Sequence, residues 1–172
     1  KQKSPKHENF YIDGISLELH FLVEKLRNST YNKRFQPWVK QSLDKRELIK
    51  RDINGVIVSL PPIQFDALYI FNHAFHHFIS GGVGLRQLCD WAMSLHTFHN
   101  QIDKDELFRN LKAFGILKAW QIFGCIAIDE IGLSKEEIPF YTPKYKKQSR
   151  KILRKILQVG NFGFYTPQGK KP

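Results

Sequence analysis

The chain has 172 residues, of which 42% are hydrophobic and 13% aromatic, a composition that is typical of globular proteins and excludes intrinsic disorder. Its length suffices for one well-buried core or two small ones. Lysine and arginine exceed aspartate and glutamate by 27 − 16 = 11, which favours partners that carry phosphate groups. Because the chain opens on Lys1 and closes on a polar run, we expect a fragment or a processed polypeptide.

Cysteine content and hydropathy indicate a compartment. Cys89 and Cys125 are too few for a disulfide framework, so a reducing environment is the default. The longest apolar stretches fall far below the ~20 residues that a bilayer span requires. No signal-peptide pattern opens the chain. We therefore expect a cytoplasmic protein with no membrane partner.

The first sixty residues carry strand signals. Residues 8–22 alternate around Asp13-Gly14, a dipeptide typical of two-residue hairpin turns. Period two places Glu18 and His20 side by side on the polar face of the second strand. Residues 22–27 predict a short helix, residues 35–48 a weaker helix, and residues 55–60 a last strand before two prolines.

The remaining residues carry helical periodicity. The sequence predicts helices over residues 63–80, 84–100, 103–114, 116–131 and 145–159. Asp103, with Glu106 three residues later, forms a capping-box pattern, and glycines 81, 82, 115, 132 and 160 follow the helix ends. The predicted fold is α+β and mostly helical, with an αβ segment over residues 1–60 and a helical domain over residues 61–172.

Three histidines lie on the more polar side of the helix predicted over residues 63–80. His73 and His77 are four residues apart, the spacing at which two imidazoles on one helix can share a metal ion. No complete ligand set is visible in the sequence. We therefore favour the interpretation that the histidines are packing and hydrogen-bonding residues between two helices. The alternative to the packing interpretation is a metal-dependent phosphohydrolase built on His73, His76 and His77.

A glycine-rich turn, residues 81–84, precedes the next predicted helix. Backbone N–H groups at that helix start, with Arg86 in the first turn, could hold an anion, although no P-loop pattern is present. A tight turn between two helices explains the same glycines without a ligand. Arg86 and Asp90 are four residues apart, which allows an ion pair or a clamp on another segment.

Basic residues dominate the end of the chain. No acidic residue follows Glu137. The cations beyond that point are Lys144, Lys146, Lys147, Arg150, Lys151, Arg154, Lys155, Lys170 and Lys171. Such a block attracts phosphates in a salt-dependent way, so nucleic acid is a candidate partner of the basic C-terminal helix. A solvated helix face without a partner is an equal alternative.

Five stretches of the sequence form a recognisable set. They are LELHF at residues 17–21, PPIQFDALYIFNHAFHHF at 61–78, GVGLRQLCDWAMSL at 82–95, PFY at 139–141 and GNFG at 160–163. In this order they resemble a bacterial family of uncharacterised nucleotidyltransferases. The resemblance implies the C-terminal portion of a nucleotidyltransferase domain of the polymerase-β type, with a small antiparallel remnant of its sheet followed by a helical bundle. Such enzymes transfer a nucleotidyl group from a nucleoside triphosphate to an acceptor, here unknown, and use Mg²⁺ held by three carboxylates.

The resemblance also suggests site residues. Glu18 matches the third carboxylate, so it is expected to be catalytic and to bind the metal ion; its position on a polar strand face agrees. The other two carboxylates belong to a G-S-x-x-x-D-x-D pattern, and the 172 residues contain no Gly-Ser pair. We therefore expect the chain alone to be inactive. The expected substrate-binding residues are His20, His73, His77, Arg86 and Asp90.

Three functions remain open from the sequence. The first is a part of a nucleotidyltransferase with a nucleoside triphosphate as one substrate. The second is a helical module that binds RNA or another polyanion. The third, the least favoured, is the histidine-based phosphohydrolase.

Overall fold

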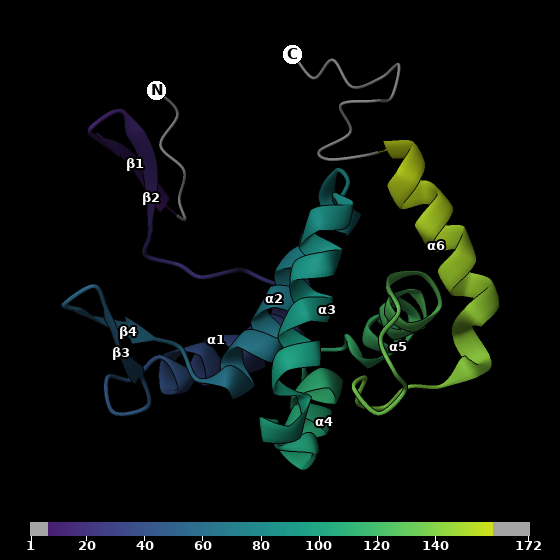
Figure 1. Cartoon of the computed structure of the whole chain (residues 1–172). Helices are drawn as coiled ribbons and strands as arrows, with labels where there is room; N and C mark the ends of the chain where they lie inside the picture. The colour runs from purple at the N-terminus through teal and green to yellow at the C-terminus, as the bar shows by residue number, and fades with distance from the viewer. Residues whose placement is uncertain (1–6, 160–172) are drawn as a thin grey trace.

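The computed structural model describes residues 7–159, which form two β-hairpins and a helical body (Figure 1). The strands are β1 (His7–Ile12), β2 (Ile15–His20), β3 (Ile49–Ile53) and β4 (Val56–Leu60). The helices are α1 (Ser29–Ser42), α2 (Ile63–Ser80), α3 (Leu85–Phe98), α4 (Lys104–Ala113), α5 (Leu117–Ile126) and α6 (Lys146–Val159). The predicted class, α+β and mostly helical, is confirmed.

The two hairpins form separate two-stranded antiparallel sheets. In the first, Asn9 pairs with Glu18, and Asp13 and Gly14 both have positive φ, as the two-residue turn requires. In the second, the turn residues Asn54 and Gly55 have the same property. Both hairpins project from the same side of the helical body in Figure 1, opposite to α6.

Strand β3 is absent from the sequence-based prediction. Its residues, IKRDI, are mostly polar and exposed, so they carry no apolar alternation. The turn is closed by the Asp52 carboxylate, which accepts a hydrogen bond from the Gly55 N–H at 2.7 Å. The turn, and not an apolar pattern, is therefore the feature that marks β3.

The predictions for residues 22–27 and 35–48 are wrong in part. Residues 22–27 form an irregular linker instead of a helix. There the Leu26 N–H donates to Oδ1 of Asn32, a side chain, at 2.9 Å. Helix α1 begins at Ser29, before the helix predicted over residues 35–48, because the Asn28 side chain accepts a hydrogen bond from the Tyr31 N–H and caps the helix.

Helix α2 matches its predicted bounds, and α3 to α6 match theirs within about two residues, apart from the end of α5. Residues Ala127–Ile131 continue α5 as a π-helix, which ends at Gly132 with φ 96°. Half of the predicted capping box forms: Asp103 accepts from the Glu106 N–H at 2.9 Å, while the Asp103 N–H donates to Gln64. The predicted stop at Gly160 lies outside the described residues.

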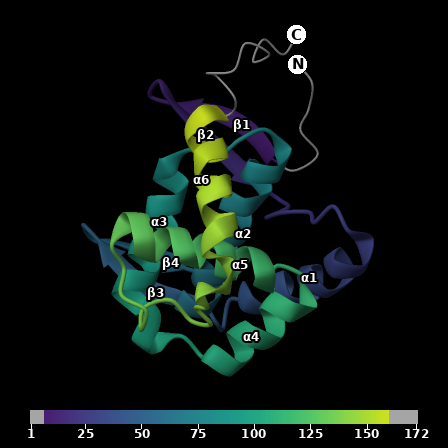
Figure 2. The same ribbon diagram turned by 90° about the vertical axis from the view of Figure 1, so that its right-hand side faces the viewer.

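The core lies between α2, α3 and α5. The rings of Trp91 and Trp120 meet edge-to-face at 4.9 Å between centroids, and Phe71 contacts both tryptophans at 5.1 Å. Phe35 and Val39 of α1 are buried in the same cluster, so α1 packs with the later helices. Figure 2 shows α6 crossing α5 on the side of the helical body that lies away from the two hairpins.

Within residues 7–159, no single helix is long and apolar enough to cross a membrane. One bent pair of helical segments, Lys104–Ala113 with Leu117–Ile131 at 117°, meets the length and composition criteria together.

Candidate functional site

The polar face of β2 carries Glu18 and His20. Oε2 of Glu18 lies 3.2 Å from Nε2 of His20, so the two side chains share a hydrogen bond. Both are accessible, with 54% of the Glu18 side chain and 39% of the His20 side chain exposed. The strand alternation that predicts them as neighbours is therefore correct. Their carboxylate and imidazole can meet a ligand or metal ion from solvent.

The α2 histidines gather on one side of the helix. Nε2 of His73 lies 3.1 Å from Nε2 of His77, and the two rings meet edge-to-face. The carboxylate that faces this group is Glu24: Nδ1 of His73 lies 3.8 Å from its Oε2, and Nδ1 of His76 lies 4.0 Å from its Oε1. His73 and His76 thus join the β2–α1 linker to α2, whereas the packing interpretation expects a second helix as their partner.

Glu24 was missed by the sequence reasoning. Only 4% of the residue is exposed, although glutamate is rarely buried without partners. Its Oε1 accepts from the Lys25 N–H at 2.8 Å, and its backbone carbonyl accepts from the Gln36 side chain at 2.8 Å. The available signal was an acidic residue directly after the apolar run Phe21 to Val23.

Asp66 and Tyr69 extend the polar side of α2 towards its N-terminus. Burial raises the pKa of the half-buried Asp66 carboxyl to about 6. Burial also raises the pKa of Tyr69, with further contributions from the charges of Glu24 and Asp66. The Tyr69 hydroxyl donates to the Val23 carbonyl at 3.5 Å, a long hydrogen bond. This side of α2 therefore contains a carboxyl that changes its charge near neutral pH.

Arg86 and Asp90 lie on α3. Nε of Arg86 is 3.9 Å from Oδ2 of Asp90, and 91% and 59% of their side chains are exposed. An exposed pair at this distance contributes little to stability. Glu18 makes no ion pair with either residue, or with His73, within the described part of the chain. The structure thus forms three separate groups: Glu18 with His20, His73 with His77, and Arg86 with Asp90.

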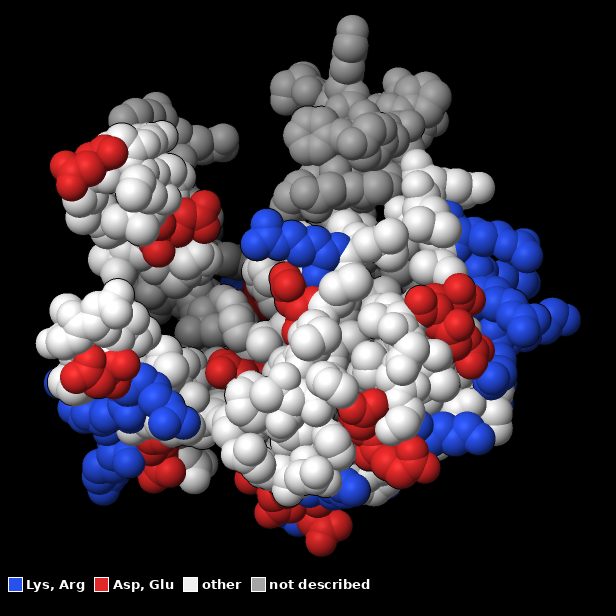
Figure 3. Space-filling model, viewed as in Figure 1, with Lys and Arg blue, Asp and Glu red and all other residues white. Residues whose placement is uncertain are grey.

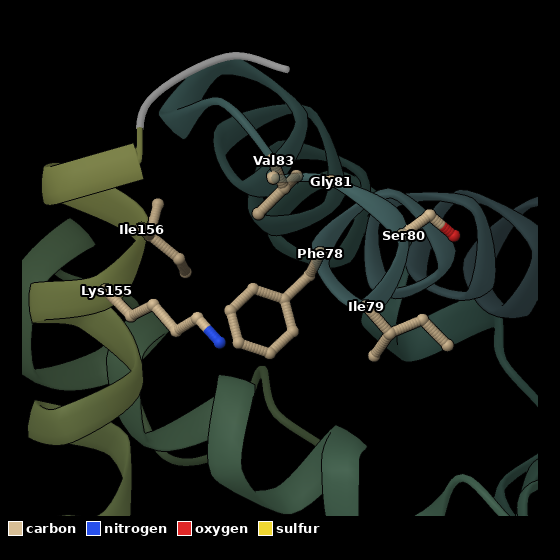
Figure 4. A pocket seen from close by; sticks show the side chains of 8 residues that line it. Phe78, Ile79, Ser80, Gly81, Val83, Lys155 and Ile156 are labelled. Carbon is tan, nitrogen blue, oxygen red and sulfur yellow. The ribbon is translucent and has the colours of Figure 1, made fainter. Parts of the chain in front are cut away.

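The glycine turn borders a cavity of about 270 Å³ between the end of α2 and α6 (Figure 4). Lys155 reaches across this space, and its Nζ lies 5.8 Å from the centroid of the Phe78 ring. The N–H groups of Gly81 and Gly82 both donate to the His77 carbonyl, so they terminate α2. The turn acts as a helix stop, and the anion-binding interpretation stays a prediction.

Most of the basic residues of α6 are exposed, and Lys146 is the one that is partly buried. Lys and Arg atoms gather in Figure 3 over the side of the molecule where α6 lies. Lys146 binds Oδ1 of Asp129 at 2.8 Å. The exposed cations Lys147, Arg150, Lys151 and Arg154 have no acidic partner in the described part of the chain. Lys170 and Lys171 lie outside it.

Metal binding can be tested against the side chains present. Among residues 7–159, no group of three or more His, Cys, Asp or Glu side chains is arranged to hold a metal ion. Glu18 offers a single carboxylate, whereas Mg²⁺ prefers six oxygen ligands in octahedral geometry. The described residues alone therefore do not fit a magnesium ion, and they do not support the histidine-based phosphohydrolase.

Comparison with known proteins identifies the family. Residues 1–127 match the sequence profile of a family described as "Uncharacterised nucleotidyltransferase". The motifs PFY at 139–141 and GNFG at 160–163 lie beyond the match, and GNFG lies outside the described residues. No curated protein and no solved structure matches the chain. Since the match covers 127 of the 172 residues, the chain belongs to the uncharacterised nucleotidyltransferase family.

Proposed function

We propose that the chain is part of an enzyme that transfers a nucleotidyl group from a nucleoside triphosphate to an acceptor. The observation that carries the proposal is the position of Glu18, an exposed carboxylate on a strand of a nucleotidyltransferase-family chain, beside His20 at 3.2 Å. Glu18 would supply one carboxylate for Mg²⁺. The remaining carboxylates would come from a Gly-Ser and paired-aspartate segment outside these 172 residues.

The surface of the first hairpin supports this proposal. The face opposite Glu18 carries exposed apolar side chains, among them Phe10 at 40%, Leu17 at 38% and Leu19 at 56% exposure. An isolated two-stranded hairpin is marginally stable in water, and a sheet face this apolar is normally covered. Both properties suit a hairpin that completes a larger sheet.

Other roles in this proposal remain predictions. His20 would orient Glu18 or a phosphate oxygen. The remaining proposed substrate-binding residues are His73, His77, Arg86 and Asp90.

Substitution of Glu18 tests the proposal in the longest natural polypeptide that contains this chain. Glu18→Gln keeps the shape and removes the charge, so transfer from an α-phosphate-labelled nucleoside triphosphate should fall by on the order of a hundredfold or more. Glu8→Gln is the matched control, because Glu8 lies on β1 opposite Leu19, on the other face of the hairpin. Equal activity of both variants would contradict the proposal.

A second function is favoured by α6, whose exposed cations lack acidic partners within residues 7–159. A polyanion such as RNA would bind this face through its phosphates, with an affinity that falls as salt is added.

A further inference from the structure

The imidazoles of His73 and His77 bring two nitrogen atoms close together on one side of α2. The residues lie one helical turn apart, and their Nε2 atoms are 3.1 Å from each other. Two imidazole nitrogens that bind one zinc ion in tetrahedral geometry, each at about 2.0–2.1 Å, are themselves about 3.3 Å apart. The distance in the structure is therefore close to the one that a shared metal ion requires, and the helix backbone maintains it.

The facing nitrogen of His73 lies on the accessible edge of its ring. Nδ1 of His73 is covered by protein, whereas 41% of the side chain is exposed. The exposed edge is thus the one away from Nδ1, which carries Nε2. His77 is also only partly buried. A metal ion can therefore reach this pair from solvent while α2 stays folded.

A buried carboxylate favours the tautomer of His73 that metal binding requires. Oε2 of Glu24, a residue that is only 4% exposed, lies 3.8 Å from Nδ1 of His73. The negative charge favours a proton on Nδ1, because this N–H then faces the carboxylate and the lone pair remains on Nε2. Histidines that bind metal ions commonly have a carboxylate on the side of their other ring nitrogen. His73 therefore has the environment that is typical of a metal ligand.

We propose that Nε2 of His73 and Nε2 of His77 together bind one divalent transition-metal ion of the class that prefers imidazole, represented by Zn²⁺. The site has two protein ligands, because no group of three or more candidate ligands is arranged around one point within residues 7–159. Water or a phosphate oxygen fills the other positions of the ion. Mg²⁺ prefers oxygen ligands, so this site is distinct from the magnesium site of the proposed function and does not rest on it.

Titration of the 172-residue chain with Zn²⁺, followed by calorimetry, tests the proposal. We expect saturable binding that the double variant His73→Asn/His77→Asn weakens by more than about tenfold, since even the loss of a group behind a ligand costs about 10–100-fold. His96→Asn/His99→Asn is the matched control. It also removes two neighbouring histidines, but their Nδ1 atoms contact Glu137 and backbone carbonyls instead of each other. This control should bind Zn²⁺ as the unaltered chain does. Absence of saturable binding below about 1 mM Zn²⁺, or equal losses in the two double variants, would overturn the proposal.

NMR spectra of the ¹⁵N-labelled imidazoles identify the bound atoms in the unaltered chain, where no substitution puts folding at risk. Zn²⁺ should shift the Nε2 resonances of His73 and His77 and leave Nδ1 of His73 protonated. Shifts that are confined to the other histidines, or a zinc ion bound through Nδ1 of His73, would contradict the assignment of the site.

Discussion

Tyr31 and Gly115 lie in direct contact, because the phenol ring of Tyr31 occupies the space where a side chain on residue 115 would begin. Gly115 also has a φ of +70°, a conformation that favours glycine. The contact fixes the start of α1 against the turn between α4 and α5. It also forms one wall of a cavity of about 190 Å³ between the start of α1 and the middle of α2.

Gly115→Ala should therefore destabilise the protein by about 2–3 kcal/mol, through backbone strain and the displacement of Tyr31. Gly132→Ala is the matched control: φ is +96° there, and a methyl group would meet nothing within 4 Å. This control should cost about 1 kcal/mol, from strain alone. Urea denaturation measures both values, and equal losses would show that the Tyr31 contact is unimportant.

The half-buried carboxyl of Asp66 predicts a pH-dependent stability. Burial raises its pKa from 3.8 to about 6 in the folded protein, so the folded state binds this proton more tightly than the unfolded state. The contribution to stability is fully present below pH 3.8 and is lost as the pH rises through 6. Above that pH the ionised group destabilises the fold by about 1 kcal/mol after allowance for solvent screening.

Asp66→Asn should consequently be more stable than the unaltered chain at pH 8, with most of the difference gone at pH 4.5. Asp105→Asn is the control, because Asp105 is an exposed acid that also lies in the first turn of a helix. Loss of its favourable interaction with the helix N-terminus should make that variant slightly less stable at pH 8. Denaturation curves at pH 8 and pH 4.5 measure the stability of both variants. A gain in stability from Asp66→Asn that is equal at the two pH values would exclude the ionisation of Asp66 as its cause.

Glu24 should be important for stability because it joins the linker to α2. Glu24→Ala removes the acceptor of the Lys25 N–H and the charge that faces His73 and His76. The expected loss in the free energy of unfolding is about 2 kcal/mol. Glu47→Ala, at an exposed position between α1 and β3, should change it by less than about 0.5 kcal/mol. If chemical denaturation gives both variants the same stability, the Glu24 contacts are not stabilising.

The elements that the sequence predicted well are those whose signal is local. Helix α2 has a continuous apolar stripe between Pro62 and Gly81, so periodicity and end residues agree. Strand β3 has no such stripe, although Asn54-Gly55 was a detectable hairpin turn. The linker over residues 22–27 has helical composition, but its backbone groups bond to side chains of Glu24 and Asn32.

The candidate sites also divide into those that a local sequence pattern predicts and those that depend on the packing of distant segments. The proximity of Glu18 to His20 follows from strand alternation, and that of His73 to His77 follows from helical spacing. The burial of Glu24 and of Asn72 depends on which segments pack against α2. Three segments that are far apart in the sequence, around Tyr31, Phe75 and Gly115, line the cavity between α1 and α2, so no local pattern could predict it.

The outward face of α6 gives the last prediction. Lys147, Arg150, Lys151 and Arg154 follow a helical spacing of three, one and three residues, so they share one face. If this face binds RNA, replacing all four with glutamine should weaken binding and flatten its salt dependence, by about 0.7 in slope for each phosphate of single-stranded RNA that is no longer neutralised. Fluorescence anisotropy at several salt concentrations measures both effects. The control replaces the exposed cations Lys33, Arg34, Lys40 and Lys45, which removes the same net charge from α1 and the segment after it. If α6 is the binding face, the salt dependence should flatten in the α6 variant and stay unchanged in the control, because only the α6 cations would neutralise phosphates. RNA binding that persists without the α6 cations, or that falls equally in the control, would exclude α6 as the binding face.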